Sequence, residues 1–341
     1  MDKILVTFLG LTACAGMAQA SHIQTTTLGA TGRSAGVRTD SATPMEQGRW
    51  SVGLNFEHSG FDQLGEQELL DLRAADPEAS LHSLDSITSM SLDVSYGLTP
   101  DISVGLHLPY IVRSDIIEAA HEHEEVTAAP GPTASRVTAA QLAGLEALGK
   151  SSGLGDLTIY GLWRFYESKA TDTNFGLIAG VKMPTGVDDN ATDTDETFET
   201  EFQPGSGSWD PFAGFAWSRS LGRFNLAAST IYTSATEGTA NTDLGDQWTY
   251  NVGTGYGLGS FEGTNWSLVL ELNGGQRDRE QVDGVTDANS GGSWLLLSPG
   301  FTVTGHDWSV YASWGYPIDD TLNGNQDDLG NRFLVGVQFM H

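Results

Sequence analysis

Twelve short segments with a side-chain period of two restrict what this chain can fold into. In residues 50–57, WSVGLNFE, large apolar residues alternate with small or polar ones. Alternation of this kind places the large apolar side chains on one face of a β-strand. The same pattern recurs at residues 90–96, 102–107, 157–165, 175–183, 209–217, 224–232, 248–256, 266–272, 294–303, 308–316 and 333–339. We therefore predict an all-β chain built from twelve strands.

The connections between these segments alternate in length. They are short after the second, fourth, sixth, eighth and tenth segments and long after the odd-numbered ones, up to the whole run 114–152. A soluble β-sandwich has no physical reason to sort its loops in this way. A bacterial outer-membrane barrel does, because it has an even number of strands, short periplasmic turns and longer outer loops. We predict a twelve-stranded antiparallel transmembrane β-barrel over residues 48–341, with both ends of the barrel chain on the periplasmic side.

The nine Trp and nine Tyr residues give an independent indication, because they all fall in or beside the predicted strands. Near the short turns lie Trp50, Tyr96, Trp163, Trp217, Tyr256, Trp266 and Trp308. Near the long connections lie Tyr110, Trp209, Tyr232, Trp248, Trp314 and Tyr316. Amphipathic rings partition to the two membrane interfaces, so two aromatic girdles are expected around a membrane barrel.

The N-terminal 20 residues have the features of a cleaved signal peptide. Lys3 comes early, an apolar run follows, and Ala18 and Ala20 precede the expected cleavage point. The four residues ending at Cys14, LTAC, also resemble a lipoprotein cleavage site, so lipid attachment at Cys14 is an alternative. A chain that is exported and then forms a membrane barrel is predicted to lie in the outer membrane of a Gram-negative bacterium. Residues 21–47 are predicted to form a periplasmic N-terminal segment ahead of the barrel.

The charge balance narrows the expected partners. Sixteen basic against 44 acidic residues give a net charge of −28, which argues against a nucleic-acid partner, because phosphate contacts need clustered Lys and Arg. Most acids lie in the long connections, where they would face lipopolysaccharide and divalent cations. His121 and His123, beside three glutamates, are candidate metal ligands, although a solvated acidic loop explains them more simply. The other expected partners are outer-membrane lipid, the barrel assembly machinery and a small-molecule solute.

Residues on the face opposite the apolar one should line the lumen of the barrel. The predicted lumen-lining residues are Glu57, Asp93, His107, Asp156, Tyr160, Arg164, Lys182, Asp210, Glu271, Tyr311 and Arg332. Asp156 and Lys182 fall near the outer ends of adjacent strands, so we predict that they form an ion pair there, apart from Arg164. Tyr166 shares the inward parity of Tyr160 and Tyr311, and these rings could stack on an aromatic solute.

Several short sequence motifs resemble those of a known family. TPMEQGRW opens the first strand at residue 43, GLGDL opens the fourth at residue 153, MPTG closes the fifth at residue 183, and SPG lies in the tenth at residue 298. These motifs, in this order, resemble the outer-membrane transporter family of the MetA pathway of phenol degradation, over about residues 43–341. The resemblance implies an outer-membrane channel for aromatic or other hydrophobic compounds. It implies no catalytic residues.

The leading hypothesis is therefore a channel for the passive passage of small, hydrophobic or aromatic solutes. The alternative is a structural or adhesive surface barrel with a blocked lumen and acidic, cation-binding outer loops. We expect no enzymatic activity, because no nucleophile, base and acid stand in a recognisable order, and we expect no cofactor.

Overall fold

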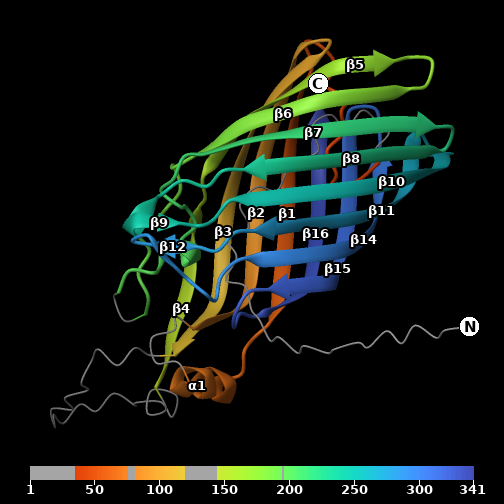
Figure 1. Ribbon diagram of the computed structural model, residues 1–341. Helices are drawn as coiled ribbons and strands as arrows, with labels where there is room; N and C mark the ends of the chain where they lie inside the picture. The colour runs from red at the N-terminus through yellow and green to blue at the C-terminus, as the bar shows by residue number, and fades with distance from the viewer. Residues whose placement is uncertain (1–34, 76–80, 120–143, 194–195) are drawn as a thin grey trace, which may run out of the picture.

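The chain forms a closed antiparallel β-barrel in the computed structural model, which describes residues 35–75, 81–119, 144–193 and 196–341 (Figure 1). Twelve strands make the wall. They are β1 (Trp50–Asp62), β2 (His82–Thr99), β3 (Ile102–Ala119), β5 (Leu157–Ser168), β6 (Thr173–Met183), β7 (Asp210–Leu221), β8 (Phe224–Thr233), β10 (Gln247–Phe261), β11 (Thr264–Arg277), β14 (Gly292–Thr304), β15 (Trp308–Leu322) and β16 (Asp328–Met340). Each strand pairs with its neighbours in the chain, and β1 closes the barrel by pairing with both β2 and β16. Each predicted segment lies within one of these strands to within one residue, so the predicted fold is confirmed.

The two faces of the wall differ as the alternation predicts. Leu54 and Leu270 are 57% and 47% exposed on the outside, whereas Glu57 and Glu271 are 2% and 1% exposed and face the inside. The predicted girdle residues are all exposed except Trp217 and Trp308, which are half-buried. An apolar exterior with two aromatic rims and a polar interior is the arrangement that a lipid bilayer requires of a barrel.

The short turns and both ends of the barrel chain lie at one end of the barrel. The backbone amide of Trp50 donates to the carbonyl of His341 over 2.9 Å, and the His341 amide donates back over 2.8 Å. Trp50 also lies opposite Tyr96, which leads into the short turn between β2 and β3. By the usual orientation of such barrels this is the periplasmic end. Within the described ranges, no helix is long and apolar enough to cross a membrane.

The wall extends beyond the membrane on the other side. Strands β2 and β3 have 18 residues each, whereas about 9–11 residues suffice to cross a bilayer. β4 (Leu145–Leu154) pairs with the half of β3 farther from the periplasmic end, and β5 pairs with the half of β3 nearer to that end. The prediction of a long loop over residues 114–152 is therefore wrong at both of its ends, because ladder pairing continues there past the membrane. Helix α1 (Glu66–Ala75) lies in the connection between β1 and β2.

Short elements lie in the other outer connections. These are η1 (Thr200–Phe202), η2 (Thr239–Asn241), and a small sheet of β9 (Thr242–Asp243), β12 (Gln281–Val282) and β13 (Val285–Thr286). The connection from β6 to β7, residues 184–209, contains η1 and folds inward over the outer mouth, as its contacts below show.

Candidate channel lumen

Residues 35–47, which we call the inner segment, run along the inside of the barrel wall. Its main anchor is the buried carboxylate of Glu271 on β11. The backbone amides of Val37, Arg38 and Thr39 donate to this carboxylate over 3.0, 3.0 and 2.8 Å, and the Thr39 hydroxyl donates over 2.7 Å. Four donors converge on one inward-facing carboxylate, so Glu271 fixes the inner segment to the wall.

Further contacts carry the inner segment across the lumen. The guanidinium of Arg38 lies 2.6 Å from Glu57 on β1, which also lies 3.7 Å from Arg332 on β16. Beyond it, the Met45 amide donates to the hydroxyl of Ser103 on β3 over 2.6 Å. Buried polar groups of the wall thus bind residues 35–47, the described part of the predicted periplasmic segment of residues 21–47, inside the barrel. Residues 1–34, with the predicted signal peptide, lie outside the described residues.

One close approach shows how tightly the inner segment lies against the wall. A Cβ atom on Gly253 of β10 would lie 2.8 Å from the carbonyl oxygen of Ala35. Real Cβ atoms are not found at that distance from a backbone oxygen, so glycine at this inward position makes room for the inner segment.

At the outer end of the lumen, Lys182 on β6 joins two carboxylates. Its ammonium lies 3.2 Å from Asp156 and 2.6 Å from Asp210, and all three side chains are buried. The predicted ion pair between Asp156 and Lys182 is therefore confirmed. Arg164, at the periplasmic end, instead lies 2.9 Å from Asp101 and 3.6 Å from Glu167.

Asp156 also holds the connection of residues 184–209, which we call the mouth loop. Its carboxylate accepts hydrogen bonds from the backbone amides of Thr185, Gly186 and Ser206, over 3.1, 2.9 and 3.0 Å, and from the Ser206 hydroxyl over 2.7 Å. Asp156 lies between the end of β4 at Leu154 and the start of β5 at Leu157. Pairing of β5 with β6 begins only at Leu157, so Asp156 has no partner residue on β6 in the strand ladder. The loop is thus fastened at a point where the strand pairing is interrupted.

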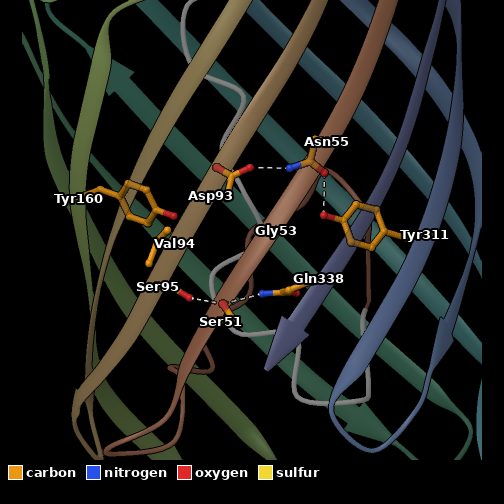
Figure 2. A pocket seen from close by; sticks show the side chains of 9 residues that line it. All are labelled: Ser51, Gly53, Asn55, Asp93, Val94, Ser95, Tyr160, Tyr311 and Gln338. Atoms are coloured by element: carbon orange, nitrogen blue, oxygen red, sulfur yellow. Dashed lines mark hydrogen bonds between the residues drawn. The ribbon is translucent and has the colours of Figure 1, made fainter. Parts of the chain in front are cut away.

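Side chains of the barrel wall line a small polar pocket of about 20 Å³ (Figure 2). Asp93 lies at its wall, with His107 Nδ1 at 2.7 Å and the Asn55 amide nitrogen at 2.5 Å. The Tyr311 hydroxyl donates to Asn55 over 2.7 Å. In Figure 2, Tyr160 and Tyr311 project from opposite sides, with their hydroxyl groups toward the pocket. The pocket therefore combines two aromatic rings with several hydrogen-bonding groups.

The outer half of the lumen also contains a buried apolar cluster, which was not predicted from the sequence. Phe198 and Phe202 of the mouth loop are 4% and 0% exposed. They pack into a cluster of buried side chains from the outer parts of the strands, namely Phe61, Leu84, Ile87, Ile111, Ile116, Leu148, Trp294, Leu296, Leu322 and Leu329. Apolar residues at inward parity, such as Ile111 next to the outward Tyr110, were the available signal. The outer half of the lumen therefore combines an apolar cluster with buried charged side chains such as Lys182 and Arg113.

Around the apolar cluster, acidic side chains of the outer connections are buried together. Glu201 of the mouth loop and Glu280 of the connection after β11 share a hydrogen bond. Burial and the neighbouring carboxylates raise the pKa of Glu201 well above its usual range, and burial raises the pKa of Glu280 to about 7. Acidic groups are therefore gathered at the outer mouth, next to the buried guanidiniums of Arg113 and Arg277.

The structure places the side chains of all eleven predicted lumen residues on the inside of the wall. Eight are buried, namely Glu57, Asp93, His107, Asp156, Tyr160, Lys182, Asp210 and Glu271, and the other three, Arg164, Tyr311 and Arg332, are half-buried. The expectation for Tyr166 is wrong, because a register shift between Arg164 and Tyr166 turns its ring outward, where it is 50% exposed. The candidate metal ligands His121 and His123 lie outside the described residues.

Comparison with known proteins agrees with this architecture. Residues 120–340, well over half of the chain, match the family described as MetA-pathway of phenol degradation. An outer membrane channel from Pseudomonas putida F1 is similar in structure, with a TM-score of 0.55 and 15% identity over 88% of this chain and 98% of that one. More distant similarities include the β domain of the Bordetella autotransporter BrkA (TM-score 0.43, 12% identity, 86% and 98% covered) and the CymD monoaromatic hydrocarbon channel (TM-score 0.39, 10% identity, 87% and 88% covered). No curated protein matches the sequence. The chain therefore belongs to the MetA-pathway of phenol degradation family and is a β-barrel of the Gram-negative outer membrane.

Proposed function

We propose that the protein is a channel for the passive passage of small hydrophobic or aromatic solutes across the outer membrane. The observation that carries this proposal is that a chain segment, and not the strand side chains alone, occupies the lumen. About eight strands make a barrel whose own side chains fill it, and larger barrels leave internal space. In this twelve-stranded barrel the inner segment occupies that space, held by hydrogen bonds and one short ion pair that can break and re-form.

The solute class is supported by the pocket and by the family. Tyr160 and Tyr311 offer ring faces and edges to an aromatic solute, while Asn55 and Asp93 offer hydrogen-bonding groups to a hydroxyl. A phenolic compound combines both properties, and the pocket would have to widen to admit its ring, because the cavity now has room for about one water molecule. The apolar cluster around Phe202 provides the outer environment through which such a solute would enter.

In this proposal the inner segment must shift for solute to pass. It blocks the space next to the pocket, because Val37 packs against Val269, Leu334 and Tyr311 on the wall. Glu271 is then the residue that sets how strongly the segment is held.

A structural barrel with a permanently blocked lumen is the second candidate. The observation that favours it is that the lumen is filled from both ends, by the inner segment and by the mouth loop with its buried Phe198 and Phe202. Acidic outer loops that meet lipopolysaccharide and divalent cations belong to either proposal, as does insertion by the barrel assembly machinery.

Single-channel conductance in planar bilayers separates the two candidates. We expect small, fluctuating conductance from the chain that begins at residue 21, and larger, steadier conductance when residues 21–47 are deleted. Glu271→Gln should lie between the two, because it weakens the anchor without removing the segment. Glu262→Gln, in the exposed turn between β10 and β11, is the matched control and should behave like the parent. Absence of conductance in all four proteins would favour the blocked barrel.

A further inference from the structure

A histidine and several glutamates meet at the outer mouth, away from the pocket. His82 opens β2, and its Nε2 lies 3.6 Å from Glu199 of the mouth loop and 3.6 Å from Glu118 on β3. Its Nδ1 lies 3.8 Å from Glu201, also of the mouth loop. One ligand atom each from His82, Glu199 and Glu201 lie within 4.8 Å of one another. A nitrogen donor and two carboxylates from two separate parts of the chain are thus already gathered.

The distances suit ligands around a shared metal ion. Hydrogen bonds between nitrogen and oxygen span about 2.7–3.2 Å, so separations of 3.6 and 3.8 Å are too long for them. Zinc binds nitrogen and carboxylate oxygen at about 2.1 Å, and two such ligands at tetrahedral positions are about 3.4 Å apart. Glu199 faces Nε2 and Glu201 faces Nδ1, and an ion binds one of these two nitrogens. One carboxylate must therefore turn toward the nitrogen that the other faces, from a starting point at which one ligand atom of each residue lies within 4.8 Å of the others.

The surroundings would fix the ring and favour a cation. The imidazole packs edge-on against Phe202 with 5.0 Å between ring centroids, so its orientation is constrained. His82 is 6% exposed, whereas Glu199 is 53% exposed and leaves a route for an ion and for a water ligand. Glu118, Glu280 and Asp287 add further negative charge around His82 and Glu201, which the buried guanidiniums of Arg113 and Arg277 near Glu201 offset in part. A divalent cation would relieve this concentration of buried negative charge.

We propose that His82, Glu199 and Glu201 bind one zinc ion, with water completing the coordination. The ion would join the mouth loop to β2 and so hold the loop over the outer end of the lumen. An imidazole nitrogen in the donor set favours zinc over calcium or magnesium, which prefer oxygen ligands. The proposed ligands do not include His121 and His123, the candidate ligands from the sequence.

Isothermal titration of the folded chain in detergent with Zn²⁺ tests the proposal. The His121→Ala/His123→Ala background removes the other histidine pair, so that these two residues cannot account for the binding measured. We expect one ion bound per chain, at least about tenfold weaker binding in Glu199→Gln and His82→Ala, and little competition from an equal concentration of Ca²⁺. Glu196→Gln, an exposed carboxylate in the same loop, is the matched control and should leave binding unchanged.

Three results would overturn the zinc site. These are no stoichiometric binding to the background protein, equal affinities in Glu199→Gln and the control, or equal displacement by Ca²⁺. In the first case, ion pairs between a protonated His82 and its glutamates account for the cluster. If His82→Ala does not fold, the comparison of Glu199→Gln with Glu196→Gln decides, because both residues are exposed enough to tolerate the change.

Discussion

Lys182 is the side chain on which the outer end of the lumen depends most. It neutralises two buried carboxylates, Asp156 and Asp210, and its ammonium also donates to the Ser206 hydroxyl of the mouth loop. Lys182→Met leaves both carboxylates buried without their cation, and we expect a loss of roughly 3–5 kcal/mol in the free energy of unfolding. Asp210→Asn leaves Lys182 paired with Asp156 and should cost clearly less. Urea unfolding of the folded barrel measures both, and equal losses would contradict this account of the cluster.

Asp327, just before β16, should make the stability of the folded barrel depend on pH. Burial raises the pKa of its carboxyl to about 6, against the hydrogen bonds from Leu64, Ser83 and Leu84 that lower it. The folded protein therefore holds this proton more tightly than the unfolded chain, and stability falls as pH rises from about 4 to 6. We expect this group to make the barrel about 1 kcal/mol more stable at pH 5 than at pH 7.5. Asp327→Asn cannot titrate, so a pH dependence unchanged by this substitution would contradict the assignment.

At the scale of elements, the strands could be predicted and the segments inside them could not. Period-two alternation identifies Leu270 as outward and Glu271 as inward. It also gives Asp156 and Lys182 the same inward parity near the outer ends of neighbouring strands, where Lys182 lies opposite Thr158 and Asp156 is two residues away. No pattern in residues 35–47 shows that their backbone amides bind Glu271, because amide groups are the same in every residue. The mouth loop is hidden in the same way, since the burial of Phe202 depends on the apolar lumen and not on any period in the loop.

The orientation of strand β11 can be tested through its two faces. Leu270 is 47% exposed toward lipid, so Leu270→Arg should destabilise the barrel by roughly 2–4 kcal/mol. Glu237→Arg, in an exposed outer connection, should cost less than about 0.5 kcal/mol. Denaturant unfolding in lipid vesicles compares the two variants. Equal losses would mean that β11 does not present Leu270 to lipid.

At the scale of the whole molecule, the ends of the barrel predict which parts reach the cell surface. Asn241 lies in the outer connection after β8, and Ala170 lies in the short turn between β5 and β6. An epitope inserted beside Asn241 should bind antibody on intact cells, and one inserted beside Ala170 should bind only after the outer membrane is opened. The reverse labelling would mean that the barrel has the opposite orientation in the membrane.

We expect solute to pass through the lumen when the inner segment moves away from its contacts with the barrel wall. Val37 packs against Val269, and the sole native cysteine, Cys14, lies in the predicted signal peptide. A chain that begins at residue 21 and carries Val37→Cys and Val269→Cys can therefore be locked by a single disulfide. Conductance in planar bilayers, recorded before and after addition of a reductant, is the most direct measurement. We predict a closed channel when the disulfide is oxidised and an open, fluctuating one when it is reduced. Equal conductance in the two states would contradict a role of the inner segment in passage.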